Sequence, residues 1–478
     1  MPPVRRTRLL FRPRSPTAAA DTGGSRGWLS ALRRKPSKRP HRAAGVVEDE
    51  GTPLSDEILV GIFDGFPEVA DLVRCAFTCR RWRRLVSSEA AFLCRTPRRP
   101  PDRFIRPLAL GFFHHQGTTA PRFVPMATAS RVLGLQRPPS LNTLVEGLDD
   151  GLLDRSRVVA SRNGLLVVEL RRRGKRDRAL KLCVCNPMTG EAHLLPPLRG
   201  KDGLGHYACT VLTAADVRDT YSATDPPSAS YYRVVMVYSR RGFTACRNYS
   251  TDGGGAWSPE AEVTGAQFDK KKMRTTGNGV VTRGGTAAYW LAKNVVFGLR
   301  LDTLTAVVEG LPSLRDGACP LDTANTLLGL SPAGKLTAVH IDRPFSLSVG
   351  KRRVTISVST YGGADDIDRL WLWMFRGRRV WDRRELTQVD QSLPDDVTSV
   401  RLRWFCQRSG VVFFTAGAGD GGERRREVYA LSLGTQTVEK VASHPGGGDP
   451  WGSIHGYEMD QEGYLTCLAE RDDIEEHT

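Results

Sequence analysis

The sequence predicts an α+β protein with two unequal parts, a small helical segment over residues 52–95 and a large all-β region after it. Apolar residues in the first part recur at the spacing of a helix, and from about residue 104 short β-branched and aromatic runs replace that pattern. The 478 residues include 48 glycines and 29 prolines, which favours a turn-rich chain over a helical bundle.

The first helix is expected to begin near Pro53 and Ser55. Serine suits the position before a helix, and the acidic pair Asp56-Glu57 stabilises the positive N-terminal end. Proline disfavours a helical residue before it, so Phe66-Pro67 ends this helix. The apolar positions, which follow one face of the helix, are Ile58, Leu59, Ile62 and Phe63.

A second helix is expected from about Ala70 to Val86. Trp82 shares a face with apolar residues, which favours a packing anchor over a base-stacking platform, because such platforms are exposed. The first half of this helix is apolar on both faces, and about 45 residues alone bury too little surface for robust stability. The second apolar face therefore predicts contact with a protein partner or with the rest of the chain.

The β region is expected to form a propeller of four-stranded blades. Runs such as GLLVVEL and YYRVVMVYS are bounded by Gly, Pro, Asn and Asp, with no helical pattern of comparable length between them. A turn residue followed three positions later by threonine recurs at Asn186, Asp302 and Gly434. At roughly 45–50 residues per blade, residues 104–470 supply about seven blades. An irregular pair of β-sandwiches is the alternative.

The net charge of +17 is concentrated in the N-terminal tail. Residues 1–45 hold twelve Lys or Arg against the single acid Asp21, so most of the basic charge lies outside the folded part. Residues 1–50 have few apolar side chains and are expected to be disordered. Their basic stretch 33–42 is open to three interpretations, a nuclear import signal, an organellar transit peptide or a plain linker. The expected location is the nucleus, the cytoplasm or both.

Several classes of site are excluded by spacing. The ten cysteines do not recur with zinc-site spacing, and no apolar run is long enough to cross a membrane, so we expect free thiols in a soluble protein without metal or cofactor. His114-His115 is interpreted as a loop pair, Gly417–Gly422 as a hairpin loop and Trp381-Asp382 as a strand start. No catalytic motif is present, which predicts a protein that is not an enzyme.

The stretch PLSDEILVGIFDGFPEVADLVRCAFTCRRWRRLVSSEAAFL, residues 53–93, resembles an F-box. It departs from that motif at Ser55, where proline is usual, and at Phe66, where leucine is usual. Later stretches resemble the grass-type F-box proteins that carry an associated β-propeller-like domain. These stretches are LGFFHHQG, PRFVP, SRNGLLVVEL, LCVCNPMTGEAHLLPPL and HGYEMDQEGYLTCLAE.

The resemblance implies a substrate-receptor subunit of an SCF-type (Skp-cullin-F-box) ubiquitin ligase. Its F-box docks on a Skp-type adaptor and through it on a cullin, and the β domain holds a target protein that the sequence does not identify. The implied adaptor-binding residues are Pro53, Leu54, Glu57, Ile58, Leu59, Ile62, Phe66, Pro67, Leu72 and Trp82. The implied parts are a basic tail 1–50, an F-box 52–95, a connector 96–120, a β-rich domain 121–470 and an acidic tail 471–478.

Two other functions stay open at this point. The basic tail and Arg80–Arg84 are compatible with a nucleic-acid-binding protein, which is the less favoured reading. A propeller can also house an enzyme, because fold alone does not decide function. Tryptophans gather in the last third of the chain, and the loops around Asp365–Asp368 and Gly417–Gly422 are the first places to expect a ligand surface.

Overall fold

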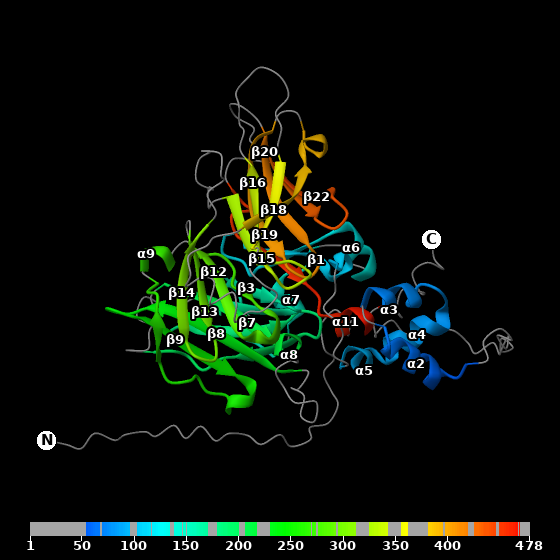
Figure 1. Cartoon of the computed structure of the whole chain (residues 1–478), viewed down its shortest axis with the longest axis horizontal. Helices are drawn as coiled ribbons and strands as arrows, with labels where there is room; N and C mark the ends of the chain where they lie inside the picture. The colour runs from blue at the N-terminus through cyan, green and yellow to red at the C-terminus, as the bar shows by residue number, and fades with distance from the viewer. Residues whose placement is uncertain are drawn as a thin grey trace.

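The computed structural model places a small group of helices against one side of a larger body of β-sheets (Figure 1). In the described part of the chain, every helix is too short or too polar to cross a membrane. The structure describes residues 54–468 except 67–68, 96–102, 116, 134–137, 146, 150, 171–178, 200–205, 218–229, 269, 274–275, 293–294, 312–324, 343–354, 362–380, 395–396, 419–424, 446–448 and 467.

The β region consists of antiparallel meanders in chain order and one sheet that joins its two ends. This last sheet, which we call the closing sheet, has the order β2–β1–β23, with β2 (Arg122–Pro125), β1 (Ala109–His114) and β23 (Ile454–Glu458). The first meander contains β3 (Arg157–Arg162), β4 (Leu165–Leu170), β5 (Lys181–Asn186) and β6 (Glu191–Leu194). The second contains β7 (Tyr207–Thr213), β8 (Tyr232–Ser239), β9 (Thr244–Ser250) and β10 (Ala261–Gly265).

The remaining three meanders complete the β region. They contain β11 (Val280–Val281), β12 (Ala287–Ala292), β13 (Val295–Arg300) and β14 (Thr305–Gly310); β15 (Thr326–Leu330), β16 (Leu336–Asp342), β17 (Thr355–Tyr361) and β18 (Trp381–Gln388); and β19 (Val397–Cys406), β20 (Val411–Ala418), β21 (Arg425–Ser432) and β22 (Thr437–Pro445).

The sheets form a closed ring. The first strand of each meander contacts the first strand of the next, in the order β3, β7, β11, β15 and β19, and β23 contacts both β19 and β3. Five meanders and the closing sheet make six blades in the described residues, which confirm a propeller-like all-β region. The expected count of about seven blades is too high. The estimate was too high because stretches between strands, such as the one from Thr213 to Tyr232, lengthen each repeat.

The recurring turn signal in the sequence marks the same place in three blades. Asn186, Asp302 and Gly434 begin the tight turns between β5 and β6, β13 and β14, and β21 and β22. In the second and third of these turns, Leu304 and Gln436 take left-handed backbone conformations with φ of 53° and 54°. The repeat therefore encodes the last hairpin of a blade.

The second and third meanders are joined at their outer rims into one eight-stranded sheet. The outer strands β10 and β14 pair in parallel, with Thr264 opposite Thr305 and Gly265 opposite Ala306. Gly265 has a φ of 86°, and a Cβ atom there would lie 2.4 Å from the carbonyl oxygen of Ala306. Glycine is therefore required for this close approach.

The helical domain contains α2 (Asp56–Asp64), α3 (Val69–Ala76), α4 (Arg80–Ser88) and α5 (Ala90–Arg95). Its buried side chains, including Leu59 and Phe63, belong to the same apolar cluster as Phe112, Phe413 and Tyr457 of the ring. Helices α6 (Ala127–Leu133), α7 (Leu141–Leu144), α8 (Ala214–Val217), α9 (Lys270–Met273) and α11 (Gln461–Thr466), with 3₁₀ turns η1 (Arg106–Leu108), η4 (Thr251–Gly253), η5 (Arg283–Gly285) and η7 (Asp390–Ser392), complete the described elements.

The closing sheet departs from the expected domain limits. Strand β1 lies within residues 96–120, which the sequence assigned to a connector, and it pairs with β23 from the far end of the β region. Local sequence patterns carry no signal for a pairing between Phe112 and Gly456, which are over three hundred positions apart. The predicted tails 1–50 and 471–478 lie outside the described residues.

Candidate docking surface

Helix α2 is short because both of its ends are capped. Ser55 precedes it, and its Oγ accepts a hydrogen bond from the backbone N–H of Ile58 at 3.4 Å. At the other end, the N–H of Gly65 donates to the carbonyl oxygens of Gly61 and Ile62. The predicted start at Ser55 is confirmed, and the helix ends at Asp64, just before the expected Phe66-Pro67 break.

The two faces of α2 differ in their exposure to solvent. Leu59 and Phe63 are 2% and 1% exposed and belong to the shared core. Leu54, Ile58 and Ile62 are 39%, 52% and 45% exposed, and their spacing of four residues places them along one side. We call these three residues the docking stripe. Exposed apolar side chains grouped in this way are typical of interaction surfaces.

Trp82 packs beneath α2. It is half-buried, and its ring meets that of Phe63 edge-on, with centroids 5.5 Å apart. Phe66 also stacks on Phe63, with ring centroids 6.2 Å apart. This arrangement agrees with the interpretation of Trp82 as a packing anchor.

The single helix expected from Ala70 to Val86 is in fact two helices. Cys79 has an extended backbone with φ of −154°, and its Sγ accepts a hydrogen bond from the N–H of Trp82, so it caps the start of α4. Thr78 Oγ1 donates to the carbonyl oxygen of Arg74 at the end of α3. Cysteine is not among the residues that prefer a helix start, which explains why the break was missed.

Two of the arginines around Trp82 hold the helical domain together. Arg81 Nε and Nη2 donate to Asp56 Oδ1 at 2.9 and 2.7 Å, and Nη2 also donates to the carbonyl oxygen of Leu54 at 2.8 Å. Arg83 Nε donates to the carbonyl oxygen of Ala76 at 3.1 Å. The contact between Arg81 and Asp56 could not be predicted from local patterns, because residues 25 positions apart carry no shared local signal. Arg81 thus fixes the chain end on which the docking stripe begins.

The implied adaptor-binding residues differ in their exposure to solvent. The docking stripe and Glu57 are exposed, Phe66 and Trp82 are half-buried, and Leu59 and Leu72 are buried. Pro53 and Pro67 lie outside the described residues. Only the exposed group is free to touch a partner directly, and the buried group supports it from beneath.

The other candidate sites lie partly outside the described residues. Ala418 pairs with Arg425, so the stretch that contains Gly417–Gly422 closes a hairpin as expected, although residues 419–422 and the Asp365–Asp368 loop lie outside the described residues. Trp404 and Trp451 are 6% and 5% exposed, so they fill space between blades. Within the described ranges, no three His, Cys, Asp or Glu side chains are placed to hold a metal ion.

The histidines of the closing sheet are buried rather than exposed on a loop. His114 ends β1, is 7% exposed and lies against Trp451, with ring centroids 4.8 Å apart. Burial, reinforced by the nearby Arg122, lowers the pKa of His114 to about 4. Burial likewise lowers the pKa of His455 on β23 to about 4.

A buried ion pair joins Arg162, at the end of β3, to Asp216 on α8, which follows β7. Arg162 Nη2 donates to Asp216 Oδ1 at 2.7 Å and to the carbonyl oxygen of Val281, and Nη1 donates to Gln407. Burial alone would raise the pKa of Asp216, but the Arg162 guanidinium lowers it below its usual range. The guanidinium of Arg162, on β3, thus binds groups on α8, on β11 and just after β19, so this cluster cross-links several blades and is not an open ligand site.

Comparison with known families agrees with this division into two domains. The model of the family described as "Domain of unknown function (DUF7595)" matches residues 124–418, more than half of the chain, and the protein belongs to that family. The F-box-like model matches residues 56–96, so the helical domain is an F-box-like domain. Among curated proteins, no sequence matches this chain.

Solved structures resemble the chain only distantly. An oligogalacturonate lyase in complex with manganese is 10% identical, with a TM-score of 0.30, and the match covers 61% of this chain and 66% of the lyase. The WD40 domain of SCAP from fission yeast is 11% identical, with a TM-score of 0.27 and coverage of 61% and 65%. The α-L-arabinofuranosidase Arb93A from Fusarium graminearum is 11% identical, with a TM-score of 0.32 and coverage of 60% and 79%.

The match thus spans just under two thirds of the length of the first two of these proteins. Likeness at these scores assigns neither their activities nor their ligands to this chain.

Proposed function

We propose that this protein is a substrate receptor of an SCF-type ubiquitin ligase. Its F-box-like domain docks on a Skp-type adaptor, which links it to a cullin, and the ring of sheets binds the target protein. The observation that carries the proposal is the docking stripe: Ile58 and Ile62 are exposed on an F-box-like helix whose opposite face is packed, and Leu54 is exposed just before that helix. Kinship with the grass-type F-box proteins and a location in the nucleus, the cytoplasm or both are parts of the same proposal.

Burial of apolar surface supplies the affinity. Each Å² of apolar surface removed from water contributes about 25 cal/mol, and well-packed anchors at the centre of an interface dominate its binding energy. Isoleucine side chains that are half exposed in the free protein have area left to bury. The hydrogen bonds of Arg81 hold the start of α2 in place before the adaptor arrives, so little ordering entropy opposes docking.

The receptor itself does no chemistry in this proposal. Holding a target on the ring and an adaptor on the stripe raises the local concentration of a target lysine near the ubiquitin carrier. The nucleic-acid alternative is less well supported, because Arg81 and Arg83 are already engaged with the helical domain. Steep loss of nucleic-acid binding with added salt would revive that alternative.

The test replaces the stripe without touching the core. Ile58→Asp with Ile62→Asp puts charges where apolar contact is expected, and we expect adaptor affinity to fall at least about 100-fold, equivalent to about 3 kcal/mol. The matched control is Leu194→Asp, because Leu194 on β6 is 54% exposed and far from α2 in sequence. Titration against a purified Skp-type adaptor measures both variants.

Leu59 is unsuitable for this test, because it is 2% exposed and its truncation would destabilise the helical domain as well as alter its surface. Unchanged adaptor affinity in the double variant, with the helical domain still folded, would refute the docking assignment.

A further inference from the structure

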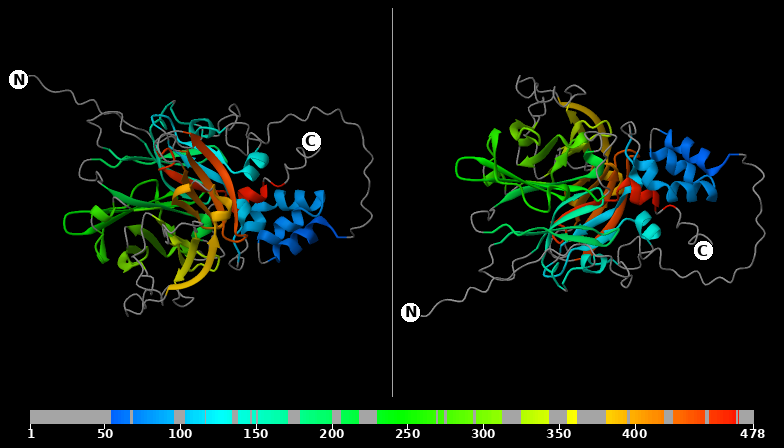
Figure 2. Two further views of the ribbon diagram at one scale, coloured as in Figure 1. Left: turned by 90° about the horizontal axis from the view of Figure 1, so that it is seen from above. Right: turned by 90° about the horizontal axis from the view of Figure 1, so that it is seen from below.

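The chain returns to the F-box-like domain after the ring closes. Residues 459–466, which we call the clasp, follow β23 and include α11. Helix α11 contacts α4 and α5, and two views at right angles to the first show it beside the helical domain (Figure 2). In sequence, the F-box-like domain is joined to the ring only through residues 96–102, so the clasp is a second and non-covalent connection.

Hydrogen bonds from three sheets fix the residues at which the clasp begins. The N–H of Met459 donates to the carbonyl oxygen of Leu108 beside β1 at 2.8 Å, and the N–H of Gly164 beside β3 donates to the carbonyl oxygen of Glu458 at 2.8 Å. The N–H of Ser409, between β19 and β20, donates to Glu458 Oε1 at 2.7 Å. The direction in which the chain leaves the ring is therefore fixed.

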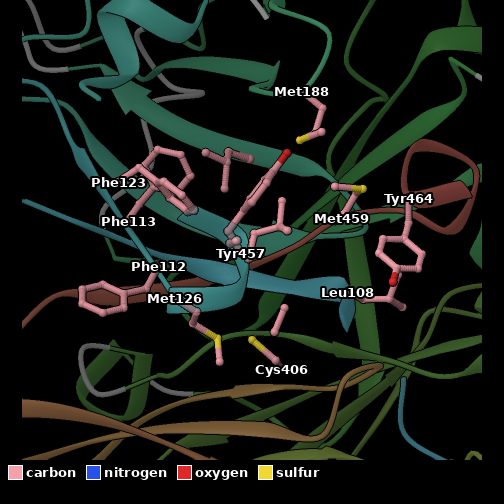
Figure 3. Close-up of a cluster of buried hydrophobic side chains, with 14 of the residues drawn as sticks. Leu108, Phe112, Phe113, Phe123, Met126, Met188, Cys406, Tyr457, Met459 and Tyr464 are labelled. Carbon is pink, nitrogen blue, oxygen red and sulfur yellow. The ribbon is translucent and has the colours of Figure 1, made fainter. Parts of the chain in front are cut away.

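The clasp buries an apolar face. Asp460 caps the start of α11, since its Oδ1 accepts a hydrogen bond from the N–H of Gly463 at 2.6 Å. Tyr464 and Leu465 are 5% and 0% exposed. Figure 3 shows Tyr464 beside Leu108, at the edge of the buried cluster inside the closing sheet.

The tip of the clasp binds the F-box-like domain. Ser87 on α4 is 7% exposed, and its Oγ donates to the carbonyl oxygen of Thr466 at 2.5 Å. Leu93 of α5 belongs to the same apolar cluster as Tyr464 and Leu465. One continuous core therefore runs from α5 through α11 into the ring.

We propose that the clasp fixes the orientation of the docking stripe relative to the ring, with Tyr464 and Leu465 as positioning residues. Domains joined by one linker move relative to each other by default, unless a large apolar interface prevents it. Tyr464 and Leu465 of the clasp lie in the apolar core that the helical domain and the ring share. The functional consequence rests on the proposed function: a receptor of fixed shape holds the target at a constant distance from the adaptor, which favours transfer to a restricted set of lysines.

The experiment measures orientation and docking separately. Dyes on the full chain at the exposed positions Arg84 and Thr435 report the distance between the helical domain and the ring by single-molecule energy transfer. For Tyr464→Ala with Leu465→Ala, we expect the distance distribution to widen about twofold or more, because the linker alone then joins the parts. Affinity for a purified Skp-type adaptor should change less than about threefold, because the docking stripe is untouched.

The control is Gln461→Ala on the same helix, which is half-buried and should leave the distribution narrow. An unchanged distribution in the double variant overturns the proposal. If that variant unfolds the ring, Ser87→Phe decides instead, since it wedges the tip of the clasp away while keeping every ring residue. A narrow distribution there also overturns the proposal. Failure of the unaltered chain to bind adaptor would instead count against the proposed function, and the distances would still decide the role of the clasp.

Discussion

The ring of sheets hides its large apolar side chains, whereas the helical domain leaves several of them in contact with solvent. Of the six large hydrophobic side chains exposed in the described residues, five lie between Leu54 and Phe92, and one, Leu194, belongs to a sheet. The ring also closes on itself through β1 and β23, whereas the helical domain draws on α11 from the far end of the chain. The ring thus buries nearly all of its large apolar side chains within the chain. The helical domain, which is expected to meet a partner, leaves apolar surface exposed.

The largest loss of stability is expected at the ion pair inside the ring. Arg162→Met removes the cation that donates hydrogen bonds to the buried Asp216 carboxylate, and breaking a buried pair in this way costs about 3–5 kcal/mol. Denaturant unfolding followed by tryptophan fluorescence measures the loss. Arg300→Met is the matched control, because the Arg300–Asp302 pair is more exposed, with side chains 25% and 50% exposed, and it should cost less than about 1 kcal/mol. Equal losses in the two variants would contradict the cross-linking role.

The helical domain can be broken from beneath. Phe63→Ala removes a ring that is 1% exposed and packed on Trp82, and we expect a loss of about 3 kcal/mol. Phe92→Ala removes the same ring from a position that is 45% exposed, so it should cost far less. Hydrogen exchange of α2 and α4 amides distinguishes the two, and similar exchange in both variants would argue against the packed face assigned to α2.

Acid should loosen the closing sheet before the rest of the ring. His114 and His455 have pKa values lowered to about 4, so the unfolded chain takes up their protons first as pH falls. The stability that the two neutral histidines contribute is fully present above about pH 6.5 and falls between about pH 6.5 and 4, by up to about 3 kcal/mol for each group. The charged neighbours Arg122 and Arg157 reinforce the effect.

Urea unfolding at several pH values measures this dependence. His114→Gln with His455→Gln should flatten the curve across the same window. The histidines would have no part in it if the slope persisted in that variant.

The smallest expected loss of stability concerns the contacts of Arg81 in the F-box-like domain. Arg81→Ala removes the bonds to Asp56 and to the carbonyl oxygen of Leu54, and we expect a loss of about 1 kcal/mol, because the pair is partly exposed. Arg84→Ala, an exposed position on the same helix, should change stability by less than about 0.5 kcal/mol. Thermal unfolding of the two variants side by side provides the measurement, and matched melting temperatures would rule out the bracing role of Arg81.

Local patterns in the sequence predicted the elements, and contacts between distant residues escaped them. Ser55 predicted the start of α2, and the turns at Asn186, Asp302 and Gly434 predicted blade hairpins, since each depends on neighbours in the chain. The break at Cys79 was missed because a thiol is a rare cap. The closing pair β1–β23 and the grip of Arg81 on Asp56 join residues with no common local signal.

The clasp was within reach of sequence reasoning. Asp460 is a favoured residue before a helix, and Tyr464 and Leu465 follow it at the positions of a buried face. Nothing in those residues, however, says that the face is shared with α4 and α5. The docking stripe was predicted as part of a larger set, and only the observed burial separates Ile58 and Ile62 from Leu59 and Leu72.

The parallel join between β10 and β14 has a consequence for the behaviour of concentrated solutions. A strand at the rim of a sheet offers unpaired backbone groups that can template pairing with another molecule. By pairing with each other, β10 and β14 remove two such rims. Strand β6 remains the outer strand of its sheet and bears Leu194, so accidental self-association among the described sheets is expected to start there.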